Sequence, residues 1–271
     1  MSFKIGFTAE NKDNTQVVVP ENTEVTTQPK KSVVQVYFPE RGTQYPYYND
    51  AFDLNVGDIV YVDGKLEGLR GVVVEVLYTF KIKLSDYKRV IARADMSVKG
   101  ELNIVDSHLV AFDPQVLPFE KILTWYKAPA NPDDEVVSSQ DDEKFNLNDL
   151  STLNISSEVA NRGREYFLRN RVVYVCVEGT HGKAIVEGSE PYEVEFAYNN
   201  GEISSLVCSC YCTYTCKHQF AAMLQLDSLL KQIEKNYPQQ YKDSNYFAAI
   251  SKKELFAVVI DTMEQGQLIL R

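Results

Sequence analysis

Apolar and polar residues alternate along two regions of the chain, and each region predicts an antiparallel sheet. In the first region, from Ser32 to about Ile91, turn residues separate the β-rich runs VVQVYF, DIVYV, GVVVEVLYTFKIKL and KRVIA. Phe80, Ile82 and Leu84 alternate with Lys81 and Lys83, which predicts a strand with one buried face. We therefore expect a small antiparallel β-barrel domain over residues 32–127, which ends with a helix over about 117–127.

The second region predicts a β-meander enclosed by helices. A helical stretch around 157–170 precedes the strand-like runs RVVYVCVEG, GKAIVEGS, YEVEFAY and EISSLV, and Asn200-Gly201 is a strong hairpin signal between the last two. Helical spacing of apolar residues over 219–236 ends at Pro238, and a last helix is expected to begin at Ser251. These patterns predict an α+β fold, with a second domain over residues 150–237 and a helical extension over 238–271.

Composition and charge complete the division of the chain. Residues 1–31 are rich in Asn, Thr, Gln and Pro and are expected to form a flexible lead, and residues 128–149 read as an acidic linker. The net charge of −10 lies mostly between residues 131 and 160, where eight Asp or Glu and one Lys give −7. No apolar run approaches the roughly 20 residues of a membrane span. Because the first residues also lack a signal-peptide pattern, we expect a cytoplasmic protein that does not enter membranes.

Four of the five cysteines fall within the nine residues from Cys208 to Cys216. Such a cluster in a reducing compartment indicates a metal site rather than a disulfide framework. The pattern C-x-C-x5-C-x-H gives a candidate Zn²⁺ ligand set of Cys208, Cys210, Cys216 and His218. We expect the first pair on a turn that leaves the hairpin and the second pair at the start of the following helix, so that zinc joins sheet to helix in a structural role. Cys212 lies between the pairs, as an alternative ligand to Cys210 or as a free, redox-sensitive thiol.

This motif, with the preceding strands IVEGSEPYEVEF and the following helix HQFAAML, resembles the SWIM zinc finger. The resemblance covers roughly residues 155–226 and implies zinc binding followed by interaction with DNA or protein. More loosely, the glycine and valine spacing from Gly57 to Val73 resembles the KOW-like segments of small SH3-type barrels.

The segment FKIKLSDYKRVIAR predicts a nucleic-acid contact surface, because it interleaves five basic residues with aromatic rings. Phosphate contacts are expected from the basic residues, and Tyr87 is expected to stack on a base. The candidate nucleic-acid residues are Lys81, Lys83, Tyr87, Lys88, Arg89 and Lys217. The alternative interpretation of this segment is a solvent-exposed strand face that binds no ligand.

The chain carries no P-loop, H-E-x-x-H or zinc-deaminase pattern, so we expect neither catalytic residues nor a nucleotide cofactor. The leading hypothesis is a non-catalytic accessory factor that binds DNA or RNA. The alternative is a protein-interaction adaptor, in which zinc only holds the fold and the acidic linker or the last helix recruits a partner. Cys176 is expected to be a buried small apolar residue, and His108 and His181 are expected to be surface or loop histidines.

Overall fold

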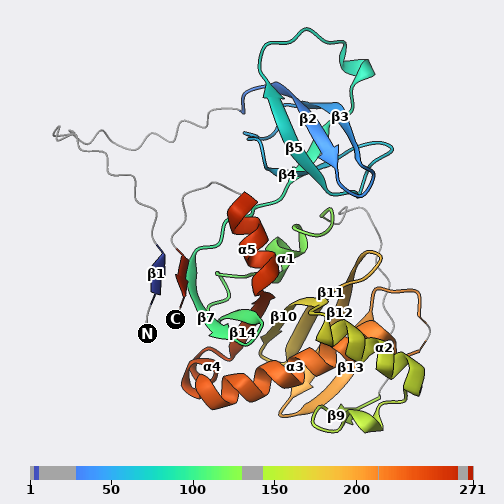
Figure 1. The fold of residues 1–271 in the computed structure, drawn as a ribbon, viewed down its shortest axis with the longest axis vertical. Helices are drawn as coiled ribbons and strands as arrows, with labels where there is room; N and C mark the ends of the chain where they lie inside the picture. The colour runs from blue at the N-terminus through green and yellow to red at the C-terminus, as the bar shows by residue number, and fades with distance from the viewer. Residues whose placement is uncertain (1–2, 6–28, 130–142, 213, 262–267, 271) are drawn as a thin grey trace, which may run out of the picture. The chain divides into compact units, whose positions relative to one another are not determined.

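The structure is a computed structural model that describes residues 3–5, 29–129, 143–212, 214–261 and 268–270. Contacts between Cα atoms divide the chain into two units: unit 1 comprises Met1–Lys4, Met96–Tyr126 and Ala130–Arg271, and unit 2 comprises Ile5–Asp95 and Lys127–Pro129. The described residues form two mainly antiparallel sheets and five α-helices (Figure 1). The expected α+β class is therefore confirmed. No helix in the described part of the chain is both long and apolar enough to cross a membrane.

Unit 2 is a five-stranded sheet with the strand order β3-β2-β5-β4-β6. Its elements are β2 (Ser32–Phe38), β3 (Thr43–Asn49), β4 (Ile59–Val62), β5 (Gly71–Leu77), a short 3-10 helix (Leu84–Asp86) and β6 (Val90–Arg93). Val34, Val36 and Phe38 alternate along β2 and are fully buried, so one face of the sheet forms the core of this unit.

Two expectations for unit 2 are corrected by the structure. In the described residues the five strands do not close a barrel, because the edge strands β3 and β6 do not pair, and an isolated bridge joins Tyr48 of β3 to Arg89, the residue before β6. The alternation at Phe80, Ile82 and Leu84 does not form a strand either, since β5 ends at Leu77 and the 3-10 helix begins at Leu84. Leu77 already lies opposite Val33, next to the first residue of β2, and β4 pairs only with Gly71 and Val72, so a longer β5 would run past the ends of both partner strands. Phe80 instead packs edge-on against Tyr48, with ring centroids 6.2 Å apart.

Unit 1 is built on a ten-stranded sheet with the order β1-β15-β7-β8-β14-β10-β11-β12-β13-β9. Its strands are β1 (Phe3–Ile5), β7 (Gly100–Val105), β8 (His108–Ala111), β9 (Phe145–Asn146), β10 (Val172–Glu178), β11 (His181–Glu187), β12 (Pro191–Asn199), β13 (Glu202–Cys208), β14 (Tyr246–Ser251) and β15 (Leu268–Leu270). Its helices are α1 (Phe119–Leu123), α2 (Ser157–Leu168), α3 (Lys217–Asn236), α4 (Pro238–Ser244) and α5 (Lys252–Asp261), with a 3-10 turn at Leu150–Thr152.

The meander β10 to β13 and the helix after it lie where the sequence predicts them. Asn200 and Gly201 both have positive φ angles, 47° and 90°, as a two-residue hairpin turn requires. α3 lies across this part of the sheet (Figure 1), and Met223, Leu226 and Ile233 from α3 are fully buried in the core of unit 1. The metal motif therefore sits where the last strand of the meander meets the helix that covers it.

The predicted domain boundaries are wrong at both sides of unit 1. Residues 96–126 were expected to complete a domain over 32–127, but β7 and β8 belong to the larger sheet, in which β8 pairs with β14. The expected helical extension over 238–271 also contains two strands, and all six residues of β14 are buried. β14 pairs with β10 on one side and with β8 on the other, so it lies inside the sheet.

Two further expectations fall largely on residues that the structure does not describe. Within the flexible lead expected over 1–31, residues 1–2 and 6–28 lie outside the described residues, and Phe3–Ile5 form β1. Within the acidic linker expected over 128–149, residues 130–142 lie outside them. Phe145–Asn146, which were included in that linker, form β9 and pair with β13.

His108 is a buried strand residue, which corrects the expectation of a surface or loop histidine. It lies on β8, is fully buried, and its Nε2 lies 3.0 Å from the carbonyl oxygen of Val172. Its Nδ1 lies 3.1 Å from Ser107 Oγ, so a neutral ring that donates from Nε2 and accepts at Nδ1 satisfies both contacts. The pKa of His108 is lowered, mainly because the ring is buried and to a smaller extent because Lys252 is positively charged. The hydrogen bond to Val172 and the charge of Asp106 act in the opposite direction but do not cancel the effect of burial.

We expect unit 1 to lose stability in mild acid because of His108. The unfolded chain protonates this histidine near pH 6.5 while the native ring stays neutral, so stability falls by at most about 1.4 kcal/mol per pH unit as the pH drops below about 6.5. Urea unfolding of the wild type and of His108→Gln at several pH values measures this slope. The slope should be shallower in His108→Gln and unchanged in His181→Gln, since His181 is exposed. Equal slopes in all three proteins would contradict the assignment.

Candidate metal centre

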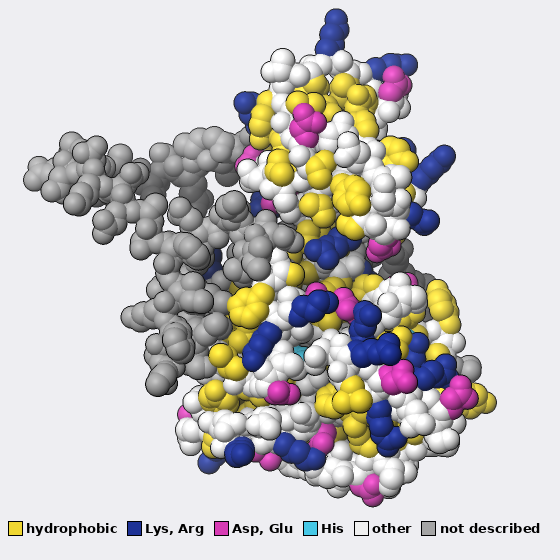
Figure 2. Space-filling view, viewed as in Figure 1, with side chains coloured by type: hydrophobic (Ala, Val, Ile, Leu, Met, Phe, Trp, Pro, Cys, Tyr) yellow, Lys and Arg dark blue, Asp and Glu magenta, His cyan; other side chains and the backbone are white. Residues whose placement is uncertain are grey.

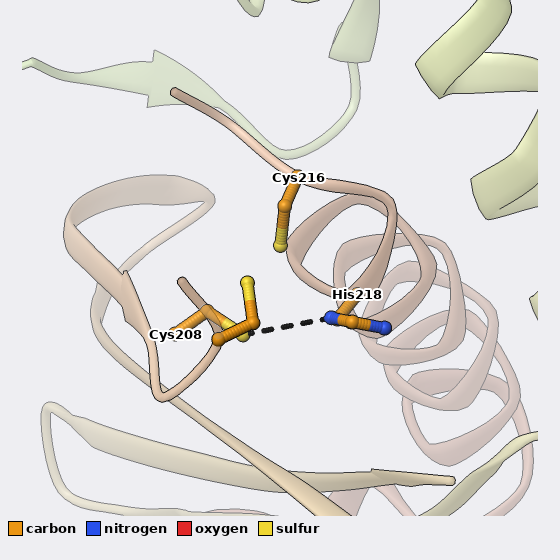
Figure 3. Close-up of side chains that lie close together, drawn as sticks. Cys208, Cys216 and His218 are labelled. Carbon is orange, nitrogen blue, oxygen red and sulfur yellow. Dashed lines mark hydrogen bonds between the residues drawn. The ribbon is translucent and has the colours of Figure 1, made fainter. Parts of the chain in front are cut away.

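Four potential metal ligands converge where β13 meets α3. One ligand atom from each of Cys208, Cys210, Cys216 and His218 lies within 4.8 Å of all the others. Cys208 is the last residue of β13, Cys216 is the N-cap of α3, and His218 lies in the first turn of α3. Figure 3 shows the side chains of Cys208, Cys216 and His218 directed toward a common space. The expected position of the second pair at the start of the helix is confirmed, whereas the first pair begins on the last residue of the strand, Cys208, and not on a turn.

The spacing of these atoms fits a tetrahedral metal ion with sulfur and nitrogen ligands. Bonds of about 2.3 Å to sulfur and about 2.0 Å to nitrogen put the ligand atoms of a tetrahedral zinc site roughly 3.5–3.8 Å apart. Cys208 Sγ lies 3.9 Å from His218 Nδ1 (Figure 3), and the complete set stays within 4.8 Å. A small contraction would bring all four atoms to bonding distance. The cluster can therefore hold a metal ion.

Cys216 is fixed by a capping box at the start of α3. Its sulfur accepts a hydrogen bond from the backbone N–H of Gln219 at 3.4 Å, and its own backbone N–H donates to Gln219 Oε1 at 2.7 Å. The amide Nε2 of Gln219 also donates to the carbonyl oxygen of Leu206 at 2.9 Å. One side chain thus ties the helix start to β13, which positions the two ligand pairs relative to each other even before a metal binds.

His218 is oriented by aromatic packing. Its ring stacks on Tyr192, with centroids 4.0 Å apart and planes at 16°, and meets the ring of Tyr166 edge-on at 5.5 Å. These contacts direct Nδ1 toward the cysteines, whereas Nε2 is buried without a hydrogen-bond partner among the described residues. A Cβ atom on Gly188 would lie 2.7 Å from the Tyr192 ring and 3.4 Å from Nε2, so a larger residue there would displace the stack.

The three sulfurs do not have equal proton affinities. A hydrogen bond from the Cys208 thiol lowers the pKa of Cys216, and hydrogen bonds from His218 and the Gln219 backbone lower it further. Burial raises this pKa, but by less than the hydrogen bonds lower it. The same hydrogen bond, followed by burial, raises the pKa of Cys208, and burial raises the pKa of Cys210. Cys216 is therefore the thiolate that the apo site favours, and a bound cation would release the protons held by the other two.

The two remaining cysteines lie outside the ligand cluster. Cys212 is exposed and does not belong to the set of four ligand atoms, whereas Cys210 does, so the geometry favours Cys210 as the ligand. Cys176 is buried on β10, and burial raises the pKa of its thiol to about 11. The expectation of a small apolar core residue at Cys176 is confirmed.

The candidate nucleic-acid residues fall into two groups. Lys81, Lys83, Tyr87, Lys88 and Arg89 lie between β5 and β6 of unit 2, and Lys217 belongs to unit 1, as the first residue of α3. The three lysines of unit 2 are exposed and Tyr87 is half-buried. Arg89 is paired with Asp50 at 2.7 Å and lies over the ring of Tyr48, so it is partly neutralised.

The residues that support the metal ligands were not identified from the sequence. A Gln three residues after the N-cap is part of the capping-box signature, but that signature is written for Ser or Thr, and Cys216 takes their place. Tyr166 and Tyr192 reach His218 from α2 and β12, and no spacing in the sequence indicates those contacts. In the comparisons with known proteins, no family model, curated protein or solved structure matches the chain.

Proposed function

We propose that the chain is a zinc-stabilised nucleic-acid-binding protein without catalytic activity of its own. In this proposal, Zn²⁺ fills the Cys208, Cys210, Cys216 and His218 site and joins β13 to α3, as in the SWIM fingers that the motif resembles. The closed set of three thiolates and one imidazole supports a structural zinc site, because a catalytic zinc keeps one coordination position open for water or substrate.

The exposed lysines of unit 2 carry the nucleic-acid part of the proposal. Lys81, Lys83 and Lys88 are exposed within an eight-residue segment between β5 and β6. Lys83 lies 3.9 Å from Asp86, and within the described residues no carboxylate pairs with Lys81 or Lys88. In a chain with a net charge of −10, a segment that presents free ammonium groups supports contact with phosphates. Tyr78, which is 47% exposed, lies three residues before Lys81 and places an aromatic ring next to this segment in the sequence.

Replacing Lys81, Lys83 and Lys88 together with glutamine is expected to weaken nucleic-acid binding and to flatten its salt dependence. Each lost phosphate contact reduces the slope of log K against log salt by about 0.9 for duplex DNA and about 0.7 for single strands, so the triple variant should lose roughly 2–3 units of slope. Fluorescence anisotropy with labelled single-stranded DNA, duplex DNA and RNA at several salt concentrations measures both quantities.

A second triple variant provides the matched control. Lys231, Lys242 and Lys253 are exposed lysines of unit 1, and their replacement with glutamine changes the net charge by the same amount. Binding that weakens equally in both variants would assign the effect to overall charge and not to the segment. Absence of binding by the wild type at low salt would reject the proposal and favour the adaptor hypothesis.

A further inference from the structure

The segment that joins Cys208 to Cys216 is held at both ends. This finger loop, residues 209–215 without the undescribed residue 213, begins at Ser209, whose backbone N–H donates to the Glu193 carbonyl oxygen at 2.9 Å. The Glu193 N–H donates back to Ser209 Oγ at the same distance. The other end runs into Cys216, fixed by Gln219. The loop is therefore presented from a stable base, as recognition loops commonly are.

Two tyrosines of the finger loop leave their rings in solvent. Tyr211 is 101% exposed and Tyr214 is 85% exposed, whereas the next most exposed tyrosines of the described chain, Tyr45 and Tyr78, reach 47%. Rings in this position add nothing to the core, although aromatic side chains contribute more buried area than almost any other residue. Their exposure on an anchored loop leaves both ring faces available for stacking.

The charge around the loop favours an anionic partner. From residue 203 to residue 226 the chain holds no Asp or Glu and one basic residue, Lys217, whose ammonium lies 4.6 Å from the ring centroid of Tyr166. Arg164 lies over the ring of Phe220 at 5.7 Å. Lys and Arg side chains gather on the part of unit 1 that α2 covers, with Asp and Glu among them (Figure 2). In sequence, the nearest carboxylates on either side are Glu202 and Asp227, and Glu193, whose backbone pairs with Ser209, is partly buried.

We infer that the finger loop binds single-stranded nucleic acid, with Tyr211 and Tyr214 stacking on unpaired bases and with Lys217 and Arg164 contacting phosphates. This inference rests on the proposed function and names its substrate class. Base–aromatic stacking needs a base whose face is free, which single strands offer and a continuous duplex does not. Three residues of chain span at most about 10 Å, so the two rings can reach neighbouring or next-neighbouring nucleotides of one strand.

Anisotropy with zinc-loaded full-length protein, labelled oligothymidine and a duplex of equal length tests this inference. Tyr211→Leu/Tyr214→Leu should weaken single-strand binding by roughly 30-fold or more, with little change in salt slope, since no charge is altered. Tyr211→Phe/Tyr214→Phe keeps both rings and should bind like the wild type. Tyr45→Leu, which removes an exposed ring from unit 2, should also leave binding unchanged. Zinc content, measured in every variant, should be the same.

The outcomes separate this inference from the proposed function. Wild-type affinity in the double Leu variant, together with weakened binding in the triple lysine variant, would overturn the inference and leave the proposed function standing. Equal losses for duplex and single strand would overturn the single-strand assignment. If the wild type bound no nucleic acid, the inference and the proposed function would both be rejected, and the finger loop would have to be tested against protein partners. Photo-crosslinking of a bromouracil oligonucleotide should map to the finger loop, and crosslinks confined to other segments would contradict the inference.

Discussion

Replacing Cys216 with serine is expected to abolish metal binding and to unfold residues 150–237 of unit 1, while unit 2 stays folded. Apparent binding energies of structural zinc in finger peptides are about 10–16 kcal/mol, far more than most single core contacts provide. Serine is itself a good N-cap, and its hydroxyl can accept the hydrogen bond that the backbone N–H of Gln219 donates to Cys216. The substitution therefore removes the ligand and retains the cap, so its effect reports on the metal.

Metal analysis and limited proteolysis with mass-spectrometric mapping check this result. The wild type should carry one zinc ion per chain, and the Cys216→Ser protein should carry none and be cleaved within residues 150–237. Cleavage of residues 32–95 should be unchanged, since these residues belong to unit 2. Cys212→Ser is the matched control, because Cys212 is an exposed cysteine of the same loop outside the ligand set. Full zinc content in Cys216→Ser would refute the assignment of this ligand.

Phe247→Ala is expected to destabilise unit 1 by about 3–5 kcal/mol, as for other Phe-to-Ala substitutions in protein cores. Phe247 is fully buried on β14 and packs edge-on against Tyr241, with ring centroids 5.5 Å apart. Its backbone pairs with Val177 of β10. The truncated side chain would leave a cavity at the centre of a sheet whose strands come from distant parts of the chain.

Urea denaturation followed by circular dichroism measures this loss of stability. Phe256→Ala is the control from the same end of the chain, because Phe256 is 38% exposed on α5 and should cost about 1 kcal/mol or less. A free helical extension would tolerate both changes equally. Similar unfolding midpoints for the two variants would therefore contradict the placement of β14 inside the sheet.

The meander and the metal ligands could be predicted from the sequence because each leaves a local signal. Alternation over Tyr192 to Tyr198, the Asn200-Gly201 turn and the periodicity of α3 are all properties of neighbouring residues. The ligand pattern is equally local, since four donors fall within eleven residues. The geometry of the site then follows from the end of β13, which holds the first ligand pair, and from the start of α3, which holds the second.

The rest of the fold depends on contacts between distant segments, which one sequence does not reveal. β14 has no alternating pattern, because both of its faces are buried and its residues are YFAAIS. Phe80 to Leu84 has the alternating pattern but no partner strand. In the site, the stacking of Tyr192 on His218 joins residues 26 positions apart, and the packing of α3 against the strand β12 brings them together.

The order of strands in the large sheet has a consequence for how the protein is made. β14 separates β8 from β10, although it is synthesised after both and after the whole metal motif. Unit 2 can fold as soon as its own strands have left the ribosome. The nascent chain, in contrast, exposes the unpaired edges of β8 and β10 until Tyr246–Ser251 emerges, and unpaired edges are where strands of other chains attach. A metal ion bound between β13 and α3 would not cover those edges, so newly made unit 1 stays open to pairing with strands of other chains until β14 is added.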